Sequence, residues 1–259
     1  MIQIENLHIS FKDKQVLKGL NLNIPQNSVF GFIGKNGAGK TTTMKVILGS
    51  LIPKEGKVFV NNEEVVFGGT NTNKYIGYLP DVPEFYSFMT AYEFLQFCAQ
   101  ITNLPKDEIN SRVEEMLKLV GLENEKHHIS GFSRGMKQRL GIAQALLNKP
   151  KLLICDEPTS ALDPVGRKQI LDILQTVSKE TTVLFSTHIL SDVEKICTDV
   201  AVLDEGVIKI QGKLDEIKSH YQKEEYSLEL ESEDDVNLLL DNFSYIKQKE
   251  DKTLYFYLE

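Results

Sequence analysis

The sequence predicts an α/β fold with an all-helical segment inserted between two of its strands, and three observations predict it. Strand-like and helix-like patterns alternate along the chain after residue 151, the order expected when helices cover a sheet. The run KLLICDE at 151–157 holds four consecutive apolar residues, as in a parallel strand buried on both faces. Between about 90 and 148, apolar residues instead recur at helical spacing.

The elements follow in a consistent order. Residues 2–33 indicate strands, with period-two alternation clearest in VLKGLNLNI. A glycine-rich loop then leads into a helix expected over about 39–48, and KVFV and YIGYL indicate short strands. After KLLICDE, strand and helix patterns alternate through PVGRKQILDILQTV, TTVLFST, LSDVEKIC, DVAVL and GVIKIQG. An N-terminal β subdomain and an inserted helical subdomain are therefore expected.

Composition is that of a soluble globular protein, at 41% hydrophobic and 25% charged residues. No apolar run approaches the ~18 residues of a membrane span. The start MIQIENLHIS alternates and lacks the apolar core of a signal peptide. The three cysteines are scattered and have no metal-like spacing, so we expect free thiols in a reducing cytosol.

Charge is unevenly placed along the chain. Residues 223–259 hold eleven acids and four lysines, a net charge of −7 out of −8 for the whole chain. We therefore expect one domain over 1–222 and a small acidic extension over 223–259, with a β-α-β-β pattern. Neither part has the basic excess of a nucleic-acid-binding domain.

GKNGAGKT, residues 34–41, is the strongest local signal. It satisfies the phosphate-loop pattern G-x-x-x-x-G-K-[ST] and lies between an apolar strand and a helical pattern, as that motif requires. Glycines let backbone N–H groups converge on phosphate oxygens. Lys40 then brings a cation to the β- and γ-phosphates, and the Thr41 hydroxyl can ligate Mg²⁺.

A pair of carboxylates follows the apolar strand at 151–155. Asp156 is predicted at the carboxyl edge of the sheet, where ligands bind, and is the candidate metal-side carboxylate. Glu157 is well placed to polarise a water against the γ-phosphate. The alternative is a solvated acidic turn before Pro158. His188 follows another strand and reaches the same edge if the two strands are neighbours.

These motifs, in this order over about residues 1–215, resemble the ATP-binding subunit of an ABC transporter, and most closely the ABC-2-type exporter group that includes bacitracin and lantibiotic export ATPases. GKNGAGKT matches the Walker A motif of that family and LLICDE its Walker B motif. SALD at 160–163 matches the D-loop, His188 the switch histidine, and SRGMKQ at 133–138 the signature. The resemblance implies a P-loop NTPase core, an ABC ATPase fold with the helical subdomain at about 90–148 between the two Walker motifs.

The resemblance also implies a head-to-tail dimer that binds ATP and Mg²⁺. Nucleotide contacts are expected from Phe11, Val16, Gly34, Asn36, Gly37, Ala38, Gly39, Lys40, Thr41 and Thr42, and in trans from Ser133 and Gly135. Metal contacts are expected from Thr41, Asp156 and Asp81, and catalytic roles for Glu157, His188 and Lys40. Phe11 is either the aromatic that stacks on adenine or a core strand residue.

Two departures from the family pattern matter. Arg134 and Met136 stand where the signature usually has glycine and glutamine, so a nucleotide contact by Arg134 is not assumed. Asp81 stands where the family has the Q-loop glutamine. Its carboxylate can accept from a metal-bound water but lacks the donor of an amide. Lys137 and Arg139 are expected to be surface charges.

FYSFMTAYEFLQF, residues 85–97, holds six of the 22 aromatic residues of the chain. Most are expected in the core of the helical subdomain. The alternative is that a few, including Phe85 and Tyr86, line a groove that receives a short helix of a membrane subunit.

The favoured function is the ATP-hydrolysing motor subunit of an exporter, coupling nucleotide-driven dimerisation to transport. Its partners would be transmembrane permease subunits and an identical or paralogous ATPase chain, with no nucleic acid. The expected location is cytoplasmic, peripheral on the inner face of the cell membrane. The alternative is a soluble ABC ATPase acting on ribosomes or DNA, which the single nucleotide domain and the lack of basic excess disfavour. A P-loop kinase or GTPase of another kind is disfavoured because SRGMKQ, SALD and the Walker B glutamate would all have to be coincidences, and because no Asn-Lys-x-Asp motif, which reads guanine, occurs.

Overall fold

The computed structural model describes residues 1–259 except 13, 70, 222–224, 244–246, 251 and 258–259. The chain divides into two compact units, Met1–Leu214 and Asp215–Glu259. In the described part of the chain, none of the helices combines the length and the apolar character that crossing a membrane requires.

A six-stranded sheet forms the centre of the first unit, with the strand order β10-β9-β3-β8-β7-β6. Its strands are β3 (Val29–Ile33), β6 (Ile76–Leu79), β7 (Leu152–Cys155), β8 (Thr182–Thr187), β9 (Asp199–Asp204) and β10 (Val207–Lys213). All neighbouring pairs from β9 to β6 are parallel, and β10 pairs antiparallel with β9. The segments that follow β3, β8, β7 and β6 therefore meet at one edge of the sheet.

An antiparallel sheet with the order β2-β1-β4-β5 forms a second layer. It comprises β1 (Ile2–Phe11), β2 (Lys14–Ile24), β4 (Glu55–Val60) and β5 (Glu63–Glu64). Its inward side chains pack with helix α1 (Lys40–Ile47) against one face of the six-stranded sheet, where Phe30, Leu152, Ile154 and Leu184 lie in the same apolar cluster. This is the predicted N-terminal β subdomain.

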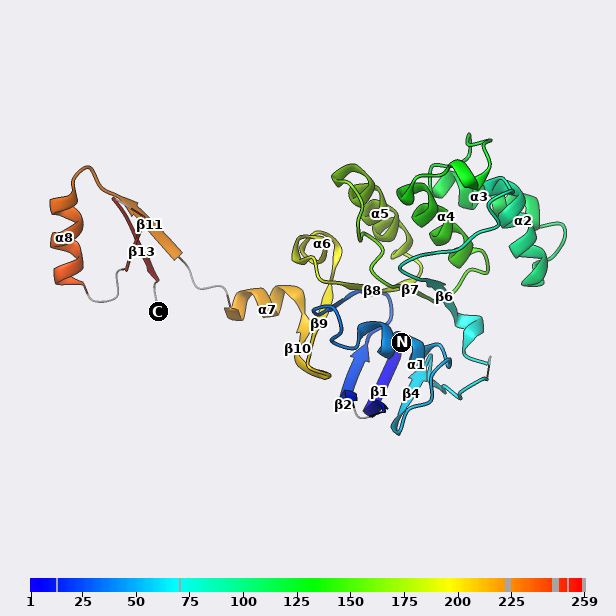
Figure 1. Cartoon of the computed structure of the whole chain (residues 1–259), viewed down its shortest axis with the longest axis horizontal. Coiled ribbons are helices and arrows are strands. Elements are labelled where there is room, and N and C mark those ends of the chain that lie inside the picture. Colours follow the sequence, from blue (N-terminus) through cyan, green and yellow to red (C-terminus); the bar gives the residue numbers. More distant parts are fainter. Residues whose placement is uncertain (13, 70, 222–224, 244–246, 251, 258–259) are drawn as a thin grey trace. The chain divides into compact units, whose positions relative to one another are not determined.

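Helices cover the other face of the six-stranded sheet (Figure 1). Between β6 and β7 the chain forms α2 (Ala91–Ile101), α3 (Ile109–Leu119) and α4 (Arg134–Leu146), and α5 (Pro164–Val177) and α6 (Leu190–Ile196) follow later. Short 3-10 turns occupy Asn73–Tyr75 and Ile129–Gly131. Leu153, Cys155 and Phe185 alternate with the residues that face α1 and pack instead against these helices. Both faces are thus buried, which explains why the strand at 152–155 is apolar throughout.

The second unit is small. After α7 (Leu214–Tyr221), it forms β11 (Glu225–Glu229), α8 (Glu233–Asn242), β12 (Lys247–Glu250) and β13 (Thr253–Tyr257). The strands pair antiparallel in the order β11-β13-β12. Ser232 caps α8 by accepting from the Asp235 N–H at 3.2 Å. The first two residues of the strand expected at YIKQK lie outside the described residues.

Candidate functional site

The phosphate-loop sequence connects β3 to α1 through a backbone that glycine makes possible. Gly37 and Gly39 have φ of 82° and 115°, conformations that residues with a side chain rarely adopt. A Cβ at Gly39 would also lie 2.7 Å from the Leu17 Cδ2 atom. The N-cap residue of α1 is Gly39, which makes no side-chain cap hydrogen bond, so the N–H groups of the first turn are available to an anion.

The ammonium of Lys40 lies across this loop and is nearly buried, with 6% of the residue exposed. Its Nζ donates to the Gly34 carbonyl at 2.6 Å and to the Lys35 carbonyl at 3.3 Å. The same atom lies 3.1 Å from Glu157 Oε1. That pair is not aligned as a hydrogen bond, and Glu157 Oε1 has no hydrogen-bond partner among the described residues. Lys40 therefore stabilises the loop and offsets the charge of Glu157.

Asp156 is buried at the end of β7 and bonded through both carboxylate oxygens. The Thr41 hydroxyl donates to its Oδ2 at 2.7 Å, and the Ser186 hydroxyl donates to its Oδ1 at 2.6 Å. Its carboxylate therefore joins the first turn of α1 to the end of β8. Burial raises the pKa of the preceding Cys155 thiol, and the nearby Asp156 charge adds to the effect. That thiol stays neutral, and all three cysteines are free, as expected.

Glu157 and His188 meet at the same edge, because β7 and β8 are neighbours. His188 Nδ1 lies 3.0 Å from Glu157 Oε2. The Glu157 backbone has φ of 48°, unusual for a residue with a side chain. Its N–H donates to the Ser186 hydroxyl at 2.8 Å, which holds that conformation.

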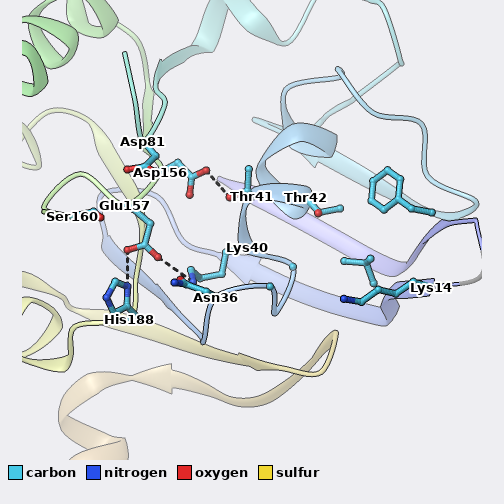
Figure 2. A pocket seen from close by; sticks show the side chains of 14 residues that line it. Lys14, Asn36, Lys40, Thr41, Thr42, Asp81, Asp156, Glu157, Ser160 and His188 are labelled. Atoms are coloured by element: carbon cyan, nitrogen blue, oxygen red, sulfur yellow. Dashed lines mark hydrogen bonds and ion pairs between the residues drawn. The ribbon is translucent and has the colours of Figure 1, made fainter. Parts of the chain in front are cut away.

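These side chains line one cavity of about 630 Å³. Figure 2 shows Glu157 between Lys40 and His188, Asp156 facing Thr41, and Asp81 beside Asp156. The lining residues are Phe11, Lys14, Val16, Asn36, Gly37, Gly39, Lys40, Thr41, Thr42, Asp81, Asp156, Glu157, Ser160 and His188. Phe11 ends β1, is 49% exposed and lies outside the apolar core. Of the residues expected to contact nucleotide in cis, Gly34 and Ala38 belong to the loop but not to the lining.

The signature residues lie elsewhere. Ser133 caps α4 by accepting from the Met136 N–H at 3.2 Å, as its position before the helix predicts. Ser133 and Gly135 line a separate pocket of about 250 Å³, together with Asp163 at the end of the D-loop-like segment. One protomer does not bring them to its own phosphate loop.

The helix α4 also corrects one expectation. Arg139 is not a plain surface charge, because its Nη1 donates to the Val120 carbonyl at 2.9 Å at the end of α3. Burial lowers the pKa of its guanidinium. Arg134 pairs with Asp81 at 3.2 Å, so the two departures from the family pattern contact each other.

Three residues in or below the site were not predicted from the sequence. Lys14 lines the cavity but stands in no motif. Ser186 hydrogen-bonds both the Asp156 carboxylate and the Glu157 N–H. Because the parallel register pairs Cys155 with Phe185, the residues that follow them, Asp156 and Ser186, lie side by side. Predicting this from sequence would require knowing that β7 and β8 are neighbours. Asp192, fully buried, accepts from Thr159 at 2.7 Å and Arg167 at 2.6 Å, joining α5 and α6 below the site.

The donor set fits the groups that the resemblance implies. Mg²⁺ is usually held by one or two carboxylates, substrate phosphates and water, and the Thr41 hydroxyl and Asp156 carboxylate supply such oxygens 2.7 Å apart. The glycine cradle and Lys40 suit a polyphosphate. The volume of the cavity is within the range of small-molecule sites.

Comparison with known proteins identifies the family of the chain. The ABC transporter family model matches residues 17–160. The chain is 43% identical over 229 residues to YxlF, an uncharacterised ABC transporter ATP-binding protein of Bacillus subtilis, covering 88% of this chain and 76% of that protein. It is 37% identical over 226 residues to the bacitracin transport ATP-binding protein BcrA of Bacillus licheniformis, covering 86% and 73%.

Solved structures extend the likeness to three dimensions. The structure of cbiO1 from Clostridium perfringens, described as part of the ABC transporter complex cbiONQ, matches with a TM-score of 0.78 and 33% identity over 84% of this chain and 90% of that one. The dimeric ATP-binding cassette MJ0796, bound to ADP and phosphate, matches with a TM-score of 0.73 and 26% identity over 83% and 99%. The chain therefore belongs to the ABC transporter family and is one of its ATP-binding subunits, with the ATPase fold of that family.

Proposed function

We propose that this subunit is a motor that couples ATP-driven dimerisation to export through separate membrane subunits. The observation that carries the proposal is the row of contacts Lys40–Glu157–His188 beside the glycine loop. It puts a cation, a carboxylate and an imidazole on the wall where a triphosphate would end. Phosphoryl transfer needs mainly this kind of positioning and charge neutralisation.

Each residue then has one task. The loop N–H groups and Lys40 bind the β- and γ-phosphates, with Phe11 and Val16 against the adenine. Glu157 orients the attacking water and accepts its proton. His188 holds Glu157 through Nδ1 and turns its other ring nitrogen to the γ-phosphate. Lys40 lies 3.1 Å from Glu157, so bound phosphates and this carboxylate would compete for the same ammonium, and a stronger pull from the phosphates would leave Glu157 free to accept a proton from water.

Thr41 and Asp156 would hold Mg²⁺, and Asp81 would reach it through water. The ion would supply positive charge to the phosphates. Ser186 keeps Asp156 in place from the opposite side, at 2.6 Å.

Ser133 and Gly135 are proposed to complete the site of a second chain, identical or paralogous. Their pocket is separate from the phosphate-loop cavity of the same protomer. The related MJ0796 cassette is described as dimeric, which supports a head-to-tail pair.

If the dimer is the active form, ATPase activity per chain should rise steeply with protein concentration before reaching a plateau. A monomer would lack the γ-phosphate contacts proposed for Ser133 and Gly135 of the second chain. The measurement is phosphate release over a hundredfold range of protein concentration, with light scattering on the same samples. A constant specific activity in samples that are monomeric would contradict the requirement for a partner.

Membrane recruitment is proposed to use the groove of about 620 Å³ lined by residues of β6, of α2 and of the segment between them, among them Tyr86, Phe97 and Ile101. Phe85 also lines this groove; it is partly buried and packs edge-on against Phe94, with the ring centroids 5.1 Å apart. Tyr86 and Ile101 are instead 50% and 62% exposed. Bacitracin and lantibiotic transport proteins among the relatives support a permease helix as the occupant, and with it a location on the inner face of the cell membrane.

Replacing Tyr86 by glutamate should release the protein from membranes in its native cells, because a charge in an apolar groove opposes helix docking. ATP affinity of the purified protein should stay unchanged. Phe67→Glu, at another exposed aromatic (53%), is the matched control. The groove assignment fails if the Tyr86 variant fractionates with membranes like the wild type. A wild-type pool bound to ribosomes or DNA would instead favour the soluble alternative.

A further inference from the structure

One face of α4 holds Asp81 at two points. Gln138 Nε2 donates to the Asp81 carbonyl at 2.9 Å, and Arg134 Nη2 donates to its carboxylate at 3.2 Å. Arg134 and Gln138 are four positions apart and therefore neighbours on the helix surface. Gln138 is fully buried, so α4 holds the Asp81 backbone through a buried side chain and the Asp81 carboxylate through Arg134.

Close packing sets this geometry. A Cβ on Gly77 of β6 would come 2.1 Å from the Ala145 carbonyl, and one on Gly141 of α4 would come 2.5 Å from Leu79 Cδ1. Helix α4 thus lies directly on β6. Asp81, two residues beyond that strand, is presented to the first turns of the helix.

The Arg134–Asp81 pair joins the two pockets of one protomer. Asp81 lines the cavity that holds the phosphate loop. Arg134 lines the pocket of Ser133 and Gly135. A residue of the signature segment therefore contacts the wall of its own nucleotide cavity.

The charge balance of that cavity indicates the effect of the Arg134–Asp81 ion pair. Three carboxylates line it, from Asp81, Asp156 and Glu157, against the two lysines Lys14 and Lys40. Lys40 is paired with Glu157, and Asp156 accepts two hydroxyl hydrogen bonds. For Asp81, the ion pair found in the described part of the chain is the one with Arg134. Without it, a carboxylate on the cavity wall would face the polyanionic substrate.

We propose that Arg134 acts in cis, as a positioning residue that compensates the charge of Asp81 and so raises the ATP affinity of its own protomer. The inference rests on the proposed ATP site but not on the dimer or on any trans contact of Arg134. Both partners are about half exposed, at 43% and 48%, so the effect is modest and weakens with salt.

The test is ATP affinity of the monomer, measured by calorimetry with EDTA present, at concentrations where light scattering shows single chains. The variants are Arg134→Gln, Asp81→Asn and the double variant. Lys137→Gln is the matched control, since it removes a cation from the same helical turn without an ion pair to Asp81. Thermal unfolding midpoints check that each variant is folded.

Arg134→Gln should weaken ATP binding about fivefold at low salt, the scale of one exposed ion pair. EDTA removes the metal contact proposed for Asp81, so under these conditions Asp81→Asn should bind ATP more tightly than wild type, and Arg134→Gln should have no further effect in that background. Arg134→Lys should restore most of the affinity, and Lys137→Gln should match wild type.

Two results would overturn the inference. Unchanged affinity in Arg134→Gln would mean that the pair does nothing in cis. An equal loss with and without Asp81→Asn would mean that Arg134 contacts the nucleotide directly or acts by general charge. A wild-type monomer that binds no ATP either with EDTA or with Mg²⁺ would instead refute the proposed function itself.

Discussion

Replacing Glu157 by glutamine should reduce turnover by about 100- to 10,000-fold, the usual contribution of a general base, while ATP binding persists. Glutamine keeps the shape of the side chain but neither accepts the proton of water nor competes for Lys40. ATP should then hold two chains together, since the product state is not reached. Phosphate release, ATP affinity and light scattering with ATP measure the three effects.

Glu205→Gln is a closely matched control for that variant. Glu205 has φ of 47°, against 48° for Glu157, and lies exposed in the turn between β9 and β10. It shares the backbone strain but lies outside the cavity lining. Turnover near the wild-type rate in Glu157→Gln would mean that another group activates the water.

Replacing Lys40 by methionine should weaken ATP binding about 100-fold, roughly 2.7 kcal/mol, the scale of one or two charge-assisted hydrogen bonds. Two causes add. The phosphates lose a buried cation, and Glu157, whose side chain is only 14% exposed, is left as an uncompensated carboxylate facing them. Adding Glu157→Gln should therefore recover part of the affinity, which calorimetry can resolve.

Lys35→Met is the control, because Lys35 lies in the same loop with its side chain exposed. It should bind ATP like the wild type. If Lys40→Met kept full affinity, the loop N–H groups alone would account for phosphate binding. If the double variant bound no better than Lys40→Met, the uncompensated Glu157 would not contribute.

The fold class was predictable because local patterns matched tertiary burial. The apolar run at 152–155 is buried on both faces, and Ser133 caps α4 as its position before an apolar face predicts. What sequence could not supply was strand order. The meeting of Glu157 with His188, and the role of Ser186, depend on β7 and β8 being neighbours.

The roles of individual charges were harder to predict. Arg134 and Asp81 are 53 positions apart, and no periodicity links them. Arg139 resembled a surface cation because its partners are backbone carbonyls at the end of another helix, and these leave no trace in composition. Side chains that bind backbone or distant loops need coordinates to be recognised.

The strand order β3-β8-β7-β6 also sets the spacing between the functional groups at the sheet edge. The phosphate loop, His188, the Asp156–Glu157 pair and Asp81 follow these four strands in turn, and adjacent strands are about 4.8 Å apart, so the row spans roughly 14 Å. Each carboxylate therefore keeps a position fixed by its own strand. A change of side-chain rotamer would not carry it one strand spacing further along without breaking its hydrogen bonds. Loss of Glu157 is thus not expected to be rescued by Asp81, one strand further along.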